Sequence, residues 1–288
     1  MPFLSTPISR RGVLAMGLAA VPMLRGQQPS ETSHWALLSD IHIAENPNDT
    51  FRGFHPTANL DAVTKKLQGL QLDGTIINGD LARLKGMPGD YTAVSSLVSA
   101  VSGKMPVAYA MGNHDNRGNF LASQLKDAGR VDLAAKHVLV IDIGPARVVV
   151  LDSLFGTDVT PGFLGKEQRN WLDTYLTGHA DKPTVLFVHH TLDDNDGSLM
   201  DADRFLKIAA AQRHVKAVFY GHSHRWSYEN LSGLHLVNIP AVGYNFEDSQ
   251  PVGWTAAVFR KDRVELTLHA TGGNRKLDGE RRNLTWRG

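Results

Sequence analysis

The first half of the chain alternates short apolar runs with longer stretches of helical periodicity. Apolar runs at 35–39, 75–77 and 107–110 have the length of buried strands, and apolar residues recur at helical spacing over 59–72 and 91–101. Strands that alternate with helices in this way are typical of βαβ units. The pattern therefore predicts a parallel sheet in an α/β fold.

The second half contains more strands than helices. Two apolar runs flank Gly144-Pro145 as in a β-hairpin. The last three strands, with a turn at Lys261-Asp262, are expected to form a meander, and the tail from Gly272 is expected to be irregular. No repeat or linker interrupts the pattern, so residues 31–288 are predicted to form a single domain. The expected strands are 138–141, 148–151, 185–188, 218–220, 234–238, 255–259 and 263–268, and the expected helices are 166–176 and 202–213.

The composition restricts the chemistry that the chain can perform. None of its 288 residues is cysteine, which excludes disulfides, thiolate metal sites and cysteine nucleophiles. Any metal site must use oxygen and imidazole ligands, which suits Mn, Fe or Zn. The formal net charge is +1, so no strong field favours a nucleic-acid polymer or an anionic membrane as partner.

The N-terminus has the pattern of a targeting signal. A twin-arginine pair, Arg10-Arg11, precedes an apolar segment over 13–24. This segment is too short to span a bilayer, which takes ~20 apolar residues. A charged region before a short apolar region is typical of a secretory signal, and paired arginines favour the twin-arginine export machinery. We therefore expect residues 1–30 to be a signal peptide and the protein to be exported to the periplasm.

Five short polar motifs follow five of the predicted strands. The carboxyl ends of parallel strands share one edge of a sheet, and ligand sites form there. The motifs can therefore converge although the sequence separates them widely. Glycine opens three of them, where the backbone must turn tightly away from the strand. The motifs are Asp40-Ile41-His42, Gly79-Asp80, Gly112-Asn113-His114-Asp115, His189-His190 and Gly221-His222-Ser223-His224.

The residue types in these motifs suit a pair of metal ions. Residues i and i+2 of an extended segment face the same side, so Asp40 and His42 can bind one ion together. Two divalent ions ~3.5–4 Å apart repel each other, and a shared carboxylate offsets that repulsion. Asp80 is the natural bridge, and Asn113 adds a neutral oxygen. The residual positive charge would attract a phosphate and acidify a bridging water to hydroxide.

The ordered set of motifs resembles the calcineurin-like metallophosphoesterase superfamily over nearly the whole chain after residue 30. Asp152-Ser153, Leu164-Gly165, Gln168, Trp171 and Leu172 further resemble the bacterial class III cyclic-nucleotide phosphodiesterase branch. The resemblance implies a four-layer α/β/β/α sandwich with two central mixed sheets and a dinuclear site at the surface.

The resemblance also implies roles for individual residues. His114 would lie beside the metals as a general acid for the leaving oxygen, and Asp115 would orient its imidazole. The first metal would be bound by Asp40, His42, Asp80 and His224, and the second by Asp80, Asn113, His189 and His222.

Two positions depart from the pattern of the family. Thr191 and Leu192 stand where a proline usually follows the histidine ligand, so either His189 or His190 could be that ligand; we favour His189. Arg83 stands where purple acid phosphatases have a tyrosine, three residues after the bridging aspartate. We therefore expect two divalent ions rather than a tyrosinate-bound ferric ion.

The expected reaction is in-line hydrolysis of a small phosphodiester by a metal-bridging hydroxide. An exported phosphomonoesterase or nucleotidase on the same site is the alternative, and a non-catalytic metal-binding module of the same fold is a third reading. A metal-dependent hydrolase of a non-phosphate substrate is disfavoured, because the His-x-His-x-Asp-His run of lactamases is absent. Candidate substrate contacts are Arg52, Phe54, His55, Arg83 and His190.

Overall fold

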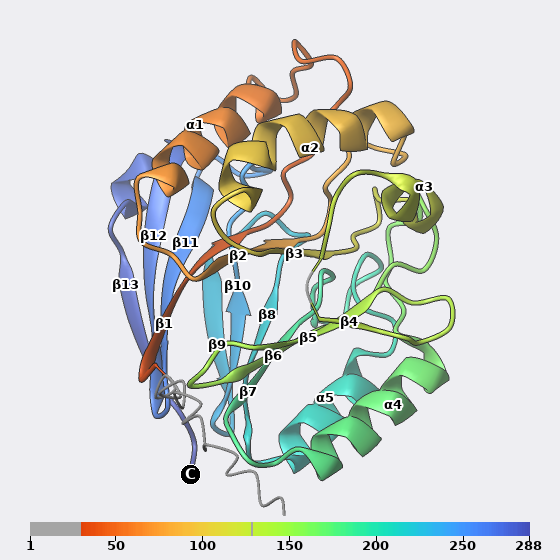
Figure 1. The fold of residues 1–288 in the computed structure, drawn as a ribbon, viewed down its shortest axis with the longest axis vertical. Helices are drawn as coiled ribbons and strands as arrows, with labels where there is room; N and C mark the ends of the chain where they lie inside the picture. The colour runs from red at the N-terminus through yellow and green to blue at the C-terminus, as the bar shows by residue number, and fades with distance from the viewer. Residues whose placement is uncertain (1–29, 128) are drawn as a thin grey trace, which may run out of the picture.

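Two β-sheets form the centre of the molecule, and helices cover their outer faces (Figure 1). The computed structural model describes residues 30–127 and 129–288. Apart from its last residue, the predicted signal peptide lies outside this range. Within the range, no helix is both long and apolar enough to cross a membrane.

The first sheet joins the early strands of the chain to the last ones. Its strands, in spatial order, are β13 (Arg281–Thr285), β12 (Arg263–Gly273), β11 (Pro251–Arg260), β1 (Thr32–Leu38), β2 (Gly74–Asn78) and β3 (Val107–Ala110). β1, β2 and β3 are parallel, as predicted, and β11 runs antiparallel to β1. The helices α1 (Pro56–Gln68) and α2 (Pro88–Ser102) lie over the outer face of this sheet (Figure 1).

The second sheet comes from the middle of the chain. Its strands, in spatial order, are β4 (Arg130–Val131), β5 (Val138–Asp142), β6 (Arg147–Val150), β7 (Thr184–Phe187), β8 (Val215–Tyr220), β10 (Leu234–Asn238) and β9 (Ser227–Leu231). β5 and β6 form the predicted hairpin, and β6, β7, β8 and β10 are parallel. The helices α4 (Gly165–Gly178) and α5 (Ala202–Ala211) cover the outer face (Figure 1).

Alternating side chains along the strands fill three separate apolar layers. In β1, Leu37 points into the layer between the sheets, whereas Leu38 points towards α1 and α2. Phe187 and Phe219 stack 4.8 Å apart between the sheets. Phe205 of α5 packs with buried residues of the second sheet. These layers confirm the predicted α/β/β/α sandwich with two mixed sheets.

Two expectations about the last third of the chain are wrong. β10 does not form a meander with β11 and β12, because it pairs in parallel with β8 in the second sheet. The tail is not irregular, because it forms the short helix η1 (Arg275–Leu277) and then β13, which pairs with β12. β13 buries only Leu284, so its sequence lacks the apolar run that would have predicted a strand.

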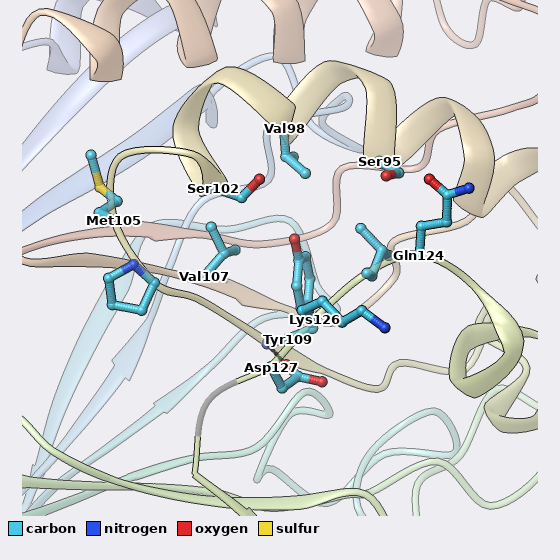
Figure 2. A pocket seen from close by; sticks show the side chains of 11 residues that line it. Ser95, Val98, Ser102, Met105, Val107, Tyr109, Gln124, Lys126 and Asp127 are labelled. Carbon is cyan, nitrogen blue, oxygen red and sulfur yellow. Dashed lines mark hydrogen bonds between the residues drawn. The ribbon is translucent and has the colours of Figure 1, made fainter.

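The free edge of β3 is closed by side chains rather than by another strand. The N–H of Tyr109 donates to Asp127 Oδ1 (2.9 Å), and His137 Nε2 lies 3.1 Å from the Tyr109 carbonyl oxygen. A cavity of about 310 Å³ opens beside them, with Ser95 of α2 and Lys126 in its lining (Figure 2). None of the residues in the five motifs lines this cavity, so it is separate from the site described next.

Candidate metal centre

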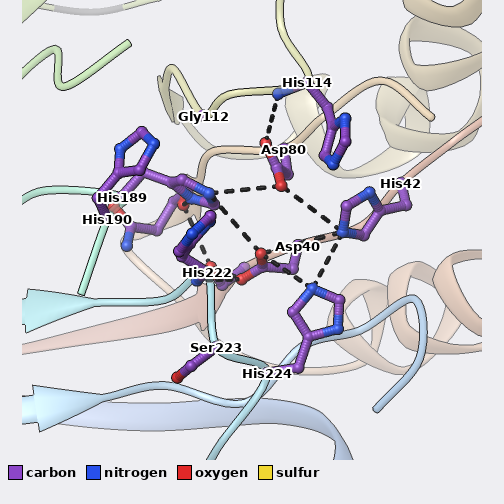
Figure 3. A network of polar contacts seen from close by, with 12 residues as sticks. Asp40, His42, Asp80, Gly112, His114, His189, His190, His222, Ser223 and His224 are labelled. Carbon is purple, nitrogen blue, oxygen red and sulfur yellow. Dashed lines mark hydrogen bonds and ion pairs between the residues drawn. The ribbon is translucent and has the colours of Figure 1, made fainter. Parts of the chain in front are cut away.

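The five motifs converge at one end of the two sheets, as their positions after strands predicted (Figure 3). Three overlapping groups of side chains each bring their potential ligand atoms within 4.8 Å of one another. We call their members, together with Asn113, the metal-site cluster. The groups are Asp40 with His42 and His224, His42 with Asp80 and His114, and Asp80 with His189 and His222.

The separations within the cluster suit shared cations. His42 Nε2 lies 3.1 Å from His224 Nε2, which lies 3.3 Å from Asp40 Oδ1. Two tetrahedral ligand atoms, each ~2.1 Å from one ion, would be roughly 3.4 Å apart. Asp80 Oδ2 lies 3.7 Å from His42 Nε2 and 3.4 Å from His189 Nε2, and therefore faces both halves of the cluster (Figure 3).

Each buried aspartate divides its oxygens between the scaffold and the site. Asp40 Oδ2 accepts hydrogen bonds from the Ser39 hydroxyl and the N–H of His222. Asp80 Oδ1 accepts a hydrogen bond from the N–H of His114 (2.9 Å). These bonds hold the carboxylates in place and leave Asp40 Oδ1 and Asp80 Oδ2 facing the cluster histidines.

Backbone carbonyls orient three of the imidazoles. The Nδ1 atoms of His189, His224 and His114 lie 2.7, 2.6 and 2.9 Å from the carbonyl oxygens of Asn78, Tyr244 and Leu84. A carbonyl oxygen can only accept, so Nδ1 carries the proton in each ring. In the neutral imidazole, Nε2 is then left with a lone pair directed at the site.

Unpartnered buried atoms show that the cluster fits metal ions. Asp40 Oδ1, Asn113 Oδ1 and His189 Nε2 are buried without a hydrogen-bond partner among the described residues. Buried polar atoms of this kind are costly unless something satisfies them. Two are oxygens and one is an imidazole nitrogen, the donor set that divalent Mn, Fe or Zn accepts.

The pKa shifts in the cluster favour anionic aspartates, neutral rings at His42 and His222, and a protonated His189. Burial alone would raise the pKa of Asp40, but His224 and His189 outweigh it and hold that pKa well below its usual range. Burial lowers the pKa of His42 to about 3 and that of His222 to about 4. Burial also opposes protonation of His189, but Asp80 and Asp40 raise its pKa to about 10. In the metal-free protein, one proton therefore resides on His189 at neutral pH.

The backbone at the site is held in an unusual conformation. Five residues of the cluster have a left-handed φ between 48° and 69°, which typically costs side-chain-bearing residues about 1–3 kcal/mol each. Strain of this kind persists only where the surrounding fold enforces it, and it gathers at functional sites. The five residues are Asp40, His42, Asp80, His222 and His224.

Glycines let the strand ends approach one another. A Cβ at Gly112 would lie 2.2 Å from Asp80 Oδ1, and a Cβ at Gly221 would lie 2.1 Å from the Ser39 hydroxyl. Gly79 has a φ of 87°, and a Cβ there would lie 2.5 Å from His189 Nδ1. The special backbone conformation that a tight turn requires is therefore seen at Gly79, whereas the structure shows that Gly112 and Gly221 are needed for the close approach of neighbouring groups.

The comparison with known families agrees with this geometry. The family model of the calcineurin-like phosphoesterases matches residues 34–226, which include every residue of the cluster. The chain belongs to the calcineurin-like phosphoesterase family. Members of this family are metal-dependent hydrolases of phosphate esters.

Two bacterial proteins that are similar to this chain carry names of phosphodiesterases. A probable cyclic nucleotide phosphodiesterase from Synechococcus sp. is 27% identical over 235 residues, which are 79% of this chain and 88% of the relative. The glycerophosphodiester phosphodiesterase GpdQ from Enterobacter lignolyticus is 24% identical over 229 residues, 75% of this chain and 81% of the relative. The crystal structure of a dimetal phosphatase from Danio rerio superposes on this chain with a TM-score of 0.72 at 15% sequence identity. The match covers 88% of this chain and 99% of the phosphatase, so the two proteins share a fold.

One expectation for this phosphoesterase needs correction: Asp115 does not orient His114. The Asp115 carboxylate accepts hydrogen bonds from the N–H groups of Leu81, Ala82 and Gly112 and from the Tyr91 hydroxyl. The carbonyl of Leu84 orients the imidazole instead. Asp115 therefore holds the loop after β2 against the loop after β3, and so positions the backbone of both.

The structure places the predicted substrate contacts in different surroundings. Arg52 donates to the carbonyls of Asn245 and Phe246, and Arg83 pairs with Asp49. His55 is exposed at the start of α1, and Phe54 exchanges two backbone hydrogen bonds with Phe51. A contact between any of these residues and substrate stays a prediction.

The two adjacent histidines face different neighbours. His189 Nε2 points at Asp80 and Asp40, which supports His189 as the candidate ligand. His190 is buried behind it, with Nδ1 2.7 Å from the Ser153 hydroxyl oxygen. Burial lowers the pKa of His190 well below its usual range, so its ring is neutral.

Sequence reasoning missed the segment that follows β10. Tyr244 stacks on the ring of His42 at 4.7 Å, and Phe246 stacks on the ring of His224 at 4.3 Å. The rule that sites form at the carboxyl ends of parallel strands also applies to β10. This segment escaped notice because it contains none of the motif-type ligands and because β10 was assigned to a meander.

Proposed function

We propose that this phosphoesterase hydrolyses phosphodiesters at a dinuclear metal site. The observation that carries the proposal is the position of Asp80. Its Oδ2 atom lies within 3.7 Å of His42 Nε2 on one side and 3.4 Å of His189 Nε2 on the other. One carboxylate between two sets of imidazoles is the arrangement that two neighbouring divalent ions require.

All residues of the cluster except His114 divide into two sets of ligands that share this carboxylate. Asp40, His42, Asp80 and His224 would hold the first ion, and Asp80, Asn113, His189 and His222 would hold the second. When bound, the pair of ions supplies positive charge that holds the phosphate and acidifies the attacking water. Two carboxylates against two divalent ions leave a net positive charge, which suits an anionic substrate.

His114 is the residue proposed to donate a proton to the leaving oxygen. The backbone N–H of His114 donates a hydrogen bond to Asp80 Oδ1, and its ring Nδ1 donates one to the carbonyl oxygen of Leu84. The ring is half-buried, with its centroid 5.3 Å from that of His42. These contacts direct Nε2 towards the cluster, where it can protonate an alkoxide as it leaves phosphorus.

The preference for diesters rests on the relatives. Both bacterial proteins compared above are named as phosphodiesterases, one for cyclic nucleotides and one for glycerophosphodiesters. A phosphomonoesterase on the same cluster is the second candidate. Initial rates on matched pairs, such as methyl p-nitrophenyl phosphate against p-nitrophenyl phosphate, separate the two. Higher kcat/KM on the monoester would contradict the diester preference.

The general-acid role predicts a dependence on the leaving group. His114→Ala is expected to lower kcat by roughly 10²–10³-fold for an alcohol leaving group such as glycerol. The loss for nitrophenolate should be below about tenfold, because that anion leaves without a proton. Equal losses on both substrates, at unchanged metal content, would contradict the role.

We also propose that the protein is exported through the twin-arginine route. The support is the Arg10-Arg11 pair followed by a short apolar segment. Replacement of both arginines by lysine keeps the charge and should retain the protein in the cytoplasm of a bacterial host. Periplasmic recovery of that variant at the level of the wild type would contradict the proposal.

A further inference from the structure

We infer that three aromatic rings beside the metal-site cluster make this enzyme select phosphodiesters that carry an aromatic group. The rings belong to Phe51, Tyr244 and Phe246, which we call the aromatic platform. The inference rests on the proposed phosphodiesterase function and adds the class of substrate. The group that the platform would bind is a flat ring, such as a nucleobase or an aryl ester.

The platform is in direct contact with the candidate ligands. Tyr244 stacks on His42 with an interplanar angle of 28°, and Phe246 stacks on His224 with an angle of 29°. The ring centroid of Phe51 lies 4.6 Å from that of Tyr244. A phosphate held at the cluster therefore has its ester groups within reach of these rings.

Two rings of the platform expose aromatic surface to solvent instead of burying it in the core. Tyr244 is buried at 3% exposure, but Phe246 is 46% exposed and Phe51 is 36% exposed. Two large exposed aromatic residues that flank a catalytic cluster are typical of a binding surface. Their faces can stack on a substrate ring, which is worth about 1–3 kcal/mol per base by alanine substitution in proteins that bind nucleic acids.

Hydrogen bonds hold the backbone that carries Phe246, and a cation lies over the ring of Phe51. Arg52 donates to the carbonyl oxygens of Asn245 (3.0 Å) and Phe246 (2.7 Å). The guanidinium of Arg83 lies 4.7 Å from the centroid of the Phe51 ring. A platform held in this way loses little conformational entropy when a ligand stacks on it.

The platform adjoins a groove on the side of the proposed general acid. Arg83 also lines a groove of about 520 Å³ together with Leu84 and Met87, whose side chains are 46% and 54% exposed. The Leu84 carbonyl is the group that orients His114. Arg83 therefore links the platform to the side of the site where the proposed general acid lies.

The test compares variants of the holoenzyme on diesters with and without a ring. The aromatic substrates are 3′,5′-cyclic AMP for the nucleobase and methyl p-nitrophenyl phosphate for the aryl ester, and glycerophosphoethanolamine is the non-aromatic one. Phe246→Ala should lower kcat/KM at least about tenfold on one or both aromatic substrates, mainly through KM. It should leave the non-aromatic substrate within about twofold. Phe246→Trp should retain the aromatic preference.

Two controls separate stacking from structural damage. Phe155→Ala removes another exposed phenylalanine, whose described aromatic contact is with Phe163 rather than with the cluster, and should leave all three efficiencies within about twofold. Phe51→Ala tests the platform independently if Phe246→Ala folds poorly, and bound metal is measured in every variant. Equal losses on aromatic and non-aromatic substrates would overturn the platform alone, as would a wild-type enzyme that prefers glycerophosphoethanolamine. A wild-type enzyme that hydrolyses no diester would overturn the proposed function as well.

Discussion

At the scale of single residues, the site depends on atoms that serve the scaffold and the metals at once. Asp40 and Asp80 each give one oxygen to the backbone and turn the other towards the cluster. The motifs predicted which residues gather, because each follows a predicted strand and the carboxyl ends of parallel strands share one edge of a sheet. They could not predict which atom each side chain turns inward. Backbone carbonyls such as that of Leu84 decide which ring atom faces the site. Because every residue has a backbone carbonyl, the sequence cannot show which of them will orient a ring.

Asp115 provides a test at this scale. Asp115→Ala leaves the N–H groups of Leu81, Ala82 and Gly112 without their acceptor, and each unsatisfied buried group costs about 1–3 kcal/mol. We expect the free energy of unfolding in urea to fall by at least about 3 kcal/mol. Asp115→Asn keeps one acceptor oxygen and should lose less. If Asp115→Ala is as stable as the wild type but His114 donates protons less well, that result would show that Asp115 does orient the His114 imidazole.

The proposed role of His189 as a metal ligand predicts that metal binding depends on pH. The carboxylates of Asp80 and Asp40 overcome the effect of burial and raise its pKa to about 10, and a metal ligand must be unprotonated. Metal uptake at pH 8 should therefore release close to one proton from His189, and the apparent affinity should rise with pH up to about 10. Calorimetric titration in two buffers with different ionisation enthalpies measures this release. No proton release at pH 8 would show that His189 is already neutral.

At the scale of elements, the strand ends decide where the chemistry lies. β1, β2, β3, β7 and β8 were predicted from their apolar runs, and each delivers a motif to the same end of the sheets. β10 was also predicted as a strand but was assigned to the wrong partners, because an apolar run does not specify which sheet it joins. The segment after β10, with Tyr244 and Phe246, was missed for that reason.

The glycine at the end of β8 gives a prediction for this scale. In Gly221→Ala the new Cβ would lie 2.6 Å from Asp40 Oδ2, so the carboxylate must move. We expect metal affinity to fall about 10–100-fold, the usual effect of disturbing a group that orients a ligand. Gly178→Ala at the end of α4 is the matched control, because its Cβ would meet nothing within 4 Å. Unchanged affinity in Gly221→Ala, measured by competition with a chelator, would show that β8 can shift without cost to the site.

At the scale of the whole molecule, two sheets hold the two halves of one site. Asp40, Asp80 and His42 follow strands of the first sheet, whereas His189 and His222 follow strands of the second. The resemblance to a known family predicted this sandwich. Hydrophobic periodicity and turn residues predicted a parallel sheet, a hairpin and a meander, but not the sandwich, because they carry no information on how sheets pack.

A site that joins two sheets should couple metal binding to stability. The ions bind the folded chain and not the unfolded one, which stabilises the fold by about 2.7 kcal/mol at a free concentration 100 times Kd. Removal of metal with a chelator should therefore lower the melting temperature, and added Mn or Zn should restore it. If the protein is shown to have lost its metal and its melting temperature is unchanged, that result would argue against ligands from both sheets.

The central claim, two ions that share Asp80, is tested most directly by metal content measured together with activity. The purified wild-type chain should bind two divalent ions, lose hydrolysis of bis-p-nitrophenyl phosphate when they are removed, and regain it with Mn or Zn. Asp80→Ala should bind fewer than two ions and be inactive. Full activity with a single ion, or an Asp80→Ala variant that keeps both ions, would contradict the claim.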